Sequence, residues 1–197
     1  MLYDKLISLP GLFIAIIFHE VAHGYTAYRL GDPTAKEAGR LTLNPLKHID
    51  IVGFICMLVF RFGWAKPVPI NPNYFKNRKR DTILVSLAGP STNFVVATIS
   101  ALIISMGFIK NDIVMESLVI TLWYNVMLGV FNLLPFPPLD GSKIVASLLP
   151  VKYEYMFYKY EKYLYLVLVA LIITNTIDKI LGPLINMSLK LLLKIVS

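Results

Sequence analysis

Two histidines and a glutamate occur within one short run near the start of the chain, His19-Glu20-Val21-Ala22-His23. On an α-helix, residues i and i+4 lie on the same face one turn apart, so both imidazoles can reach a single Zn²⁺ ion. The glutamate between them is then placed to take a proton from water bound to that ion. The spacing therefore predicts two metal ligands and a general base, the parts of a hydrolytic zinc site.

A third metal ligand must come from elsewhere, because a catalytic zinc normally has three protein ligands and one open position. The single cysteine, Cys56, excludes a cysteine-based zinc ribbon. His48 is a weak candidate, since capping or an interfacial role explains a histidine in the polar loop 44–50 equally well. Asp140 is stronger, because it follows a run with three prolines that prevents a regular helix at the end of an apolar segment. Irregular backbone near a membrane indicates a wet interior site.

A structural role for the histidines is the alternative, in which both imidazoles hydrogen-bond to neighbouring helices. Three ionisable groups within one helical turn are costly in hydrocarbon unless they are paired or bind a metal. The surroundings of this run are strongly apolar, so the functional interpretation is favoured.

The composition predicts a membrane protein. Of the 197 residues, 56% are hydrophobic and 16% are charged, whereas a soluble domain has about 25% charged residues. Segment 6–30, which carries the histidine run, is expected to be a retained helix, because no small-residue cleavage site follows a short apolar core. Three further stretches contain no Asp, Glu, Lys, Arg or His and reach or approach the roughly 20 residues of a membrane span: 82–109, 117–139 and the shorter 163–177.

The remaining apolar segments are not simple spans. Segment 51–60 is too short to cross a bilayer and is interpreted as re-entrant or interfacial, and 180–197 is either a short span or an amphipathic interfacial helix. The expected fold is an all-α polytopic membrane protein, a transmembrane helix bundle with re-entrant or interfacial elements and room for a short β-hairpin. We expect a single domain over 1–197, with a catalytic core at about 10–145 and membrane helices at about 160–197.

The net charge is +7, but the basic residues lie between apolar segments and not along one polar face. Their distribution therefore indicates how the protein is oriented in the membrane and does not indicate nucleic-acid binding. Six lysines and arginines fall within 61–80, but only one lysine falls within 110–116. Alternating spans then place the amino terminus outside and Asp140 toward the cytoplasm, at the same depth as the histidine run. We expect a multi-pass protein of the plasma membrane with its site on the cytoplasmic side.

The histidine run together with the pattern N-x-x-P-x-P-x-L-D-G, from Asn132 to Gly141, resembles the site-2 protease family of intramembrane zinc metalloproteases. The resemblance implies His19, His23 and Asp140 as the ligands of one Zn²⁺ ion and Glu20 as the general base on zinc-bound water. It also implies that Asn132 holds the scissile carbonyl or its oxyanion. The chain looks like a minimal core without the PDZ or CBS domains of many relatives.

A shorter element, Gly89 to Asn93, resembles the G-x-x-x-N motif of the same family, with Asn93 as a candidate substrate contact. A Gly-Pro helix start with a polar packing residue explains this element about equally well.

Segment 64–71 is a candidate for holding an extended substrate, because a helical substrate hides its peptide bonds. In a strand, the nitrogens of Pro67 and Pro69 face one edge and have no N–H to donate. The N–H groups of Lys66, Val68 and Ile70 face the other edge, which can therefore pair with another strand. Strand addition at this edge would make Val68 a substrate-binding residue. The alternative is a proline-stiffened loop on the membrane surface.

These observations favour an intramembrane zinc endopeptidase that cleaves in or near a transmembrane segment of a protein substrate within the lipid bilayer, as in regulated intramembrane proteolysis. One alternative is a zinc-binding membrane transporter or sensor, which would not need Glu20. Another is an assembly factor in which the motif is a relic. No nucleic-acid partner is expected, and the sequence leaves the oligomeric state open.

Overall fold

The computed structural model describes residues 2–50, 52–53 and 65–196, with the side chains of 2–6 left out. All regular elements in this part are helices: α1 (Leu2–Arg29), α2 (Thr34–Glu37), α4 (Arg78–Ser105), α5 (Asp112–Asn132), α6 (Asp140–Leu148), α7 (Val151–Lys159), α8 (Glu161–Ile173), α9 (Thr176–Val196) and the 3-10 turns η1 (Pro45–Lys47) and η2 (Pro72–Tyr74). The expected re-entrant segment 51–60, apart from 52–53, and Cys56 lie outside the described residues.

Three helices are long and apolar enough to cross a membrane: Ile7–Arg29 within α1, α4 and α5. The pair α8 and α9 passes the same test when taken together, with a bend of 83° between the two helices. The described chain is therefore an all-helical fold with three or four candidate membrane spans, as the composition predicts. Ile49 and Ala65 form an isolated antiparallel bridge, and no strand occurs among the described residues.

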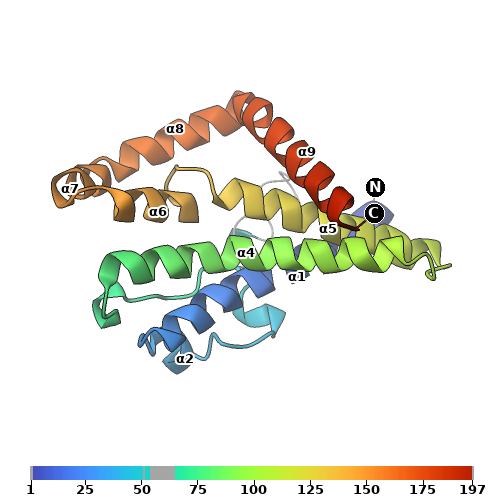
Figure 1. The fold of residues 1–197 in the computed structure, drawn as a ribbon, viewed down its shortest axis with the longest axis horizontal. Coiled ribbons are helices and arrows are strands. Elements are labelled where there is room, and N and C mark those ends of the chain that lie inside the picture. The colour runs from blue at the N-terminus through green and yellow to red at the C-terminus, as the bar shows by residue number, and fades with distance from the viewer. Residues whose placement is uncertain (1, 51, 54–64, 197) are drawn as a thin grey trace.

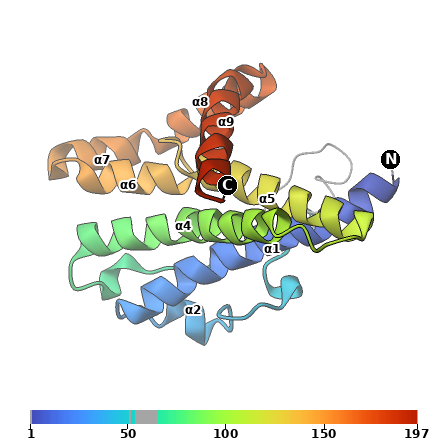
Figure 2. The same ribbon diagram turned by 45° about the vertical axis from the view of Figure 1, so that its right-hand side comes forward.

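The helices α1, α4 and α5 pack against one another and form the centre of the bundle. Figures 1 and 2 show α6 and α7 at the end of this bundle where α4 begins. Asparagine side chains start two of the central helices, since Asn77 accepts a hydrogen bond from the backbone of Arg80 and Asn111 from that of Val114. The larger apolar core joins α4 and α5 to α8 and α9, through residues such as Val126 and Leu181.

Residues 133–139, here called the proline loop, separate α5 from α6. Leu134 and Leu139 are buried and fix the loop on the bundle, so that α6 begins at Asp140. A Cβ atom at Gly141 would collide with the carbonyls of Leu133 and Leu134. The loop can therefore fold back this closely only because residue 141 has no side chain.

Residues 65–71, here called the strap, run in irregular extended backbone beside α1. Arg40 donates to the carbonyls of Lys66 (2.5 Å) and Pro67 (3.1 Å), and Asp32 accepts from the backbone N–H of Asn71 (2.7 Å). Both anchoring side chains are buried. Charged partners thus hold the two ends of the strap in place.

Candidate metal centre

Helix α1 and the start of α6 bring three potential ligand atoms together in the interior of the protein. The Nε2 atoms of His19 and His23 are 2.9 Å apart, and Oδ2 of Asp140 lies 3.2 Å from the first and 2.9 Å from the second. All three residues are buried. The structure therefore joins residues more than a hundred positions apart into one cluster that can hold a metal ion.

The far side of each imidazole determines which nitrogen faces the cluster. His23 Nδ1 lies 2.7 Å from the carbonyl oxygen of Val85, which can only accept, so Nδ1 carries the proton. His19 Nδ1 lies 2.6 Å from Oδ1 of Asn93, whose amide nitrogen in turn donates to the carbonyl of Ala15. Neutral histidines in this arrangement both present an unprotonated Nε2 to the cluster.

The donor set fits a zinc ion. Two nitrogen lone pairs and a carboxylate oxygen repel one another at this distance unless protons or a cation lie between them. A tetrahedral zinc site with bonds of about 2.0–2.1 Å has ligand atoms about 3.3 Å apart, close to the separations of 2.9–3.2 Å found here. The three residues can therefore close on a zinc ion with small movements and leave a fourth position open.

Asp140 is held as a carboxylate, and it lies outside the candidate membrane spans. Burial alone would raise the pKa of its carboxyl group, but hydrogen bonds from His19 and His23, made when these imidazoles are protonated in the metal-free protein, and the nearby charge of Lys143 hold the pKa well below its ordinary value. Lys143 Nζ lies 3.2 Å from Oδ1, the oxygen that does not face the histidines. This ion pair leaves Oδ2 as the oxygen available to a metal.

Glu20 is tied to the strap. Its Oε2 accepts a hydrogen bond of 2.8 Å from the backbone N–H of Val68. The sequence predicts three backbone donors on one edge of the strap, the N–H groups of Lys66, Val68 and Ile70. Two of them have partners within the chain, because Val68 donates to Glu20 and Lys66 donates to the carbonyl of His48. The contact fixes one oxygen of Glu20 next to the metal-binding helix face and makes Val68 a buried part of the site.

A cavity of about 200 Å³ opens beside the cluster. His23 and Asp140 form one side of it, and Val68 and Ile70 of the strap form another. The cavity gives the buried ligand atoms a route to a bound molecule.

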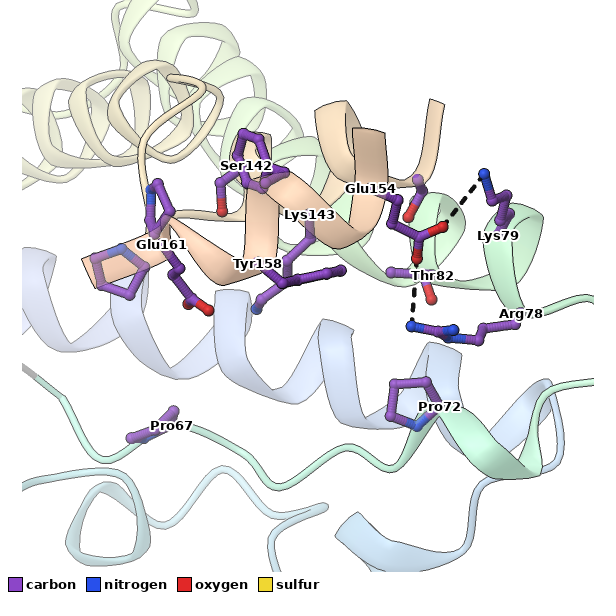
Figure 3. Close-up of a pocket in the computed structure, with 14 residues that line it drawn as sticks. Pro67, Pro72, Arg78, Lys79, Thr82, Ser142, Lys143, Glu154, Tyr158 and Glu161 are labelled. Carbon is purple, nitrogen blue, oxygen red and sulfur yellow. Dashed lines mark ion pairs between the residues drawn. The ribbon is translucent and has the colours of Figure 1, made fainter. Parts of the chain in front are cut away.

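A second cavity, of about 390 Å³, adjoins the first, and the two share Pro72, Thr82 and Lys143 in their walls. Figure 3 shows Glu154 of α7 reaching toward Lys79 and Arg78 at the start of α4, with ion-pair distances of 3.3 Å. The two cavities together connect the candidate metal centre with the region between the strap and α7.

Gly89 allows α4 to approach the two histidines. A Cβ atom at this position would collide with His23 Nε2 and would lie 2.6–2.7 Å from the imidazole of His19. In the predicted G-x-x-x-N element, the glycine thus leaves room for the imidazoles, a role that the sequence alone did not indicate.

The structure gives the other predicted residues different positions. Asn93 is fully buried, and both its oxygen and its nitrogen are engaged by neighbouring groups. Asn132 ends α5, donates to the carbonyl of Leu128 in its own helix, and lines neither cavity. His48 is not part of the cluster, and its Nε2 donates to the carbonyl of Thr42.

Sequence reasoning missed Asn125, Lys143 and the anchors of the strap. Asn125 is fully buried in the middle of α5 and bonds to Asn93. An uncharged amide within an otherwise apolar span is the signal that could have identified it. Nothing in the sequence pairs Arg40 or Asp32 with the strap.

Known proteins are similar to this chain in sequence. The model of peptidase family M50 matches residues 103–175. YwhC of Bacillus subtilis (strain 168), described as a "Putative zinc metalloprotease", is 38% identical over 100% of this chain and 95% of its own length. Rip2 of Mycolicibacterium smegmatis, with the same description, is 28% identical over 88% of this chain and 69% of Rip2.

A further relative is zinc metalloprotease MJ0392 of Methanocaldococcus jannaschii, which is 29% identical over 74% of this chain and 35% of its own length. No solved structure matches the chain significantly. The match to YwhC extends over the whole chain and includes both halves of the candidate metal centre. The chain therefore belongs to peptidase family M50, the site-2 protease family of zinc metalloproteases.

Proposed function

We propose that this protein is an intramembrane endopeptidase that uses one Zn²⁺ ion to hydrolyse a peptide bond in or near a transmembrane segment of another protein. The observation that carries the proposal is the buried cluster of His19, His23 and Asp140 in a chain of this family. Membership of the family supports a peptide bond as the target, and the candidate spans support a substrate within the bilayer.

In the proposed reaction, the zinc ion, Glu20 and Asn132 have separate chemical roles. When bound by the cluster, zinc acts as a Lewis acid and lowers the pKa of water to about 7. Glu20 is the general base: Val68 holds one of its oxygens, and the other accepts a proton and later delivers it to the leaving amine. Asn132 is the proposed oxyanion donor, because its amide has two N–H bonds and Leu128 takes one of them.

The substrate must reach the buried cluster as an extended chain, because a helix already uses its own peptide groups. The strap borders the cavity that touches His23 and Asp140, which supports a substrate strand lying along it in contact with Val68. The N–H of Val68 is not available to pair with a substrate strand, since it already donates to Glu20. The N–H of Ile70 is then the donor that a substrate carbonyl would use.

The protein is a single membrane-embedded domain, supported by the match to YwhC over the whole chain. It is a multi-pass protein of the plasma membrane with the metal centre toward the cytoplasm, supported by the basic residues within 61–80.

The decisive experiment compares wild type with Glu20→Gln in purified protein. We expect one zinc ion per chain in both, and cleavage of a model transmembrane peptide by wild type that a chelator abolishes and added zinc restores. Loss of the general base should lower the rate about 10²- to 10⁴-fold in Glu20→Gln. A His19→Ala variant should lose zinc and activity together.

The same comparison tests the alternative function. A protein that binds zinc, cleaves no peptide and behaves identically after Glu20→Gln would be a transporter or sensor, and the endopeptidase proposal would be wrong.

A further inference from the structure

A line of hydrogen bonds crosses the central bundle from α5 through α4 to α1 and ends on a candidate metal ligand. Asn125 Nδ2 donates to the carbonyl of Thr121 (2.8 Å), and Asn93 Nδ2 donates to Oδ1 of Asn125 (2.9 Å). His19 Nδ1 lies 2.6 Å from Oδ1 of Asn93. Both asparagines are fully buried, at 0% exposure, so the line is shielded from water.

Backbone carbonyls fix the direction of every bond in this line. The carbonyl of Thr121 can only accept, so the nitrogen of Asn125 faces it and the oxygen of Asn125 faces Asn93. The carbonyl of Ala15, 2.9 Å from the nitrogen of Asn93, fixes the second amide in the same sense. The oxygen of Asn93 must then face His19, and His19 must carry its proton on Nδ1.

This direction matters because the other side of the imidazole faces a competing acceptor. Oδ2 of Asp140 lies 3.2 Å from His19 Nε2. A neutral His19 without a partner at Nδ1 would place its proton on Nε2 and donate it to this carboxylate. That proton would occupy the position in which a metal ion must bind.

We propose that Asn93 and Asn125 form an amide relay that holds His19 in the tautomer with a bare Nε2 and so prepares it to bind zinc. Both are positioning residues, since they act through His19 and have no exposed surface toward substrate. The inference rests on the proposed function and replaces the substrate contact expected of Asn93. Groups behind the ligands of a metal site commonly change metal affinity by about 10- to 100-fold.

A purely structural role predicts something different. Polar side chains between membrane helices can act as packing contacts alone, and their loss would then affect folding without changing the protonated nitrogen of His19. Ser100 provides a matched control, because it is also buried in α4 but its hydroxyl, within the part of the chain that the structure describes, bonds to the carbonyl of Val96 in its own helix alone.

The first measurement is zinc affinity by chelator competition in purified full-length protein. Asn93→Leu should bind zinc about 10- to 100-fold more weakly than wild type. Asn125→Leu should give a smaller loss, because Asn93 keeps its bond to Ala15, and Ser100→Ala should match wild type. Wild-type affinity in either asparagine variant, or an equal loss in Ser100→Ala, would overturn the relay.

The second measurement is the tautomer of His19 by ¹⁵N spectroscopy of histidine-labelled, metal-free protein at a pH that keeps imidazoles neutral. The chain has three histidines, and His48 is the internal reference, because its Nε2 donates to Thr42. We expect the His19 proton on Nδ1 in wild type and on Nε2 in Asn93→Leu, with His48 unchanged. The same tautomer of His19 in both proteins would refute the inference.

The two readouts separate this inference from the proposed function. If wild type bound no zinc, the endopeptidase proposal would fail, while the tautomers would still decide the relay. If wild type bound zinc and cleaved peptide, but Asn93→Leu kept both the affinity and the tautomer, the relay alone would be wrong.

Discussion

Each residue of the candidate metal centre depends on a second group that orients it. Val85 and Asn93 hold the two imidazoles, and Lys143 pairs with the oxygen of Asp140 that points away from them. A metal site whose ligands are fixed in this way loses little freedom when it binds its ion, since the side chains are already oriented. The absence of a side chain matters as much at Gly89, which gives both histidines their space.

Gly89→Ala should impair zinc binding without removing any ligand. The added methyl group would overlap the imidazoles of His19 and His23, so either α4 or both rings must move. Overpacking of this kind costs about 1–3 kcal/mol, which corresponds to about 5- to 150-fold in affinity if the strain falls on the metal centre. Chelator competition measures the loss, and thermal unfolding in detergent measures any accompanying destabilisation.

Gly182→Ala is the matched control for this prediction. Gly182 also lies inside a helix, α9, but a Cβ atom there meets nothing within 4 Å. The variant should bind zinc as wild type does and be slightly more stable, because alanine is the better helix former by about 1 kcal/mol. Equal zinc affinity in both alanine variants would show that α4 does not need its glycine.

At the scale of single residues, the sequence predicted the three residues that form the candidate cluster but not the groups that orient them. The spacing of His19 and His23 places them on one helix face, and the prolines before Asp140 mark the irregular segment that brings it in. The pairing of Asn125 with Asn93 depends on how α4 and α5 are rotated against each other, and single-helix periodicity does not determine that rotation.

Among the elements, the strap is the segment for which the sequence predicts a role in binding an extended substrate. Its prolines were expected to leave the donors of alternate residues on one edge. The structure uses the N–H of Lys66 and of Val68 for internal partners, His48 and Glu20. The sequence could not indicate this, because both partners come from segments distant along the chain. The substitution Val68→Pro would therefore disturb Glu20 as well as a bound substrate, so it cannot test strand pairing alone.

Ile70→Pro tests strand pairing at the next donor of the strap. Removing this N–H should lower kcat/KM for a transmembrane peptide about 2- to 10-fold, the size of one lost hydrogen bond of about 0.5–1.5 kcal/mol. Zinc content should stay at the wild-type level, since Ile70 borders the cavity without contributing a ligand. The measurement is steady-state cleavage together with metal analysis.

Ile70→Ala is the control, because it removes most of the side chain that packs near Phe75 and Val85 but keeps the N–H. If alanine and proline reduced cleavage equally, packing and not strand pairing would explain the role of this residue.

The whole molecule combines a metal-binding bundle with a bent carboxyl-terminal pair. Apolar composition predicted the spans of α1, α4 and α5 with bounds up to seven residues from those observed, because chain length and hydrophobicity alone set the membrane requirement. The 83° bend between α8 and α9 was not predicted. The break lies at Asn175, which adopts a left-handed backbone with φ of 53°, and no glycine marks this position in the sequence.

The orientation of this bundle follows from charge and can be tested with two single cysteines. In a Cys56→Ser background, Lys110→Cys and Lys76→Cys place exposed thiols before α5 and before α4, at opposite ends of α4. Because basic residues concentrate within 61–80, a membrane-impermeant maleimide should label residue 110 in intact bacterial cells and residue 76 only after lysis. The reverse pattern would place Asp140 outside the cell while leaving the zinc chemistry intact, so substrates would then be cut from the external side.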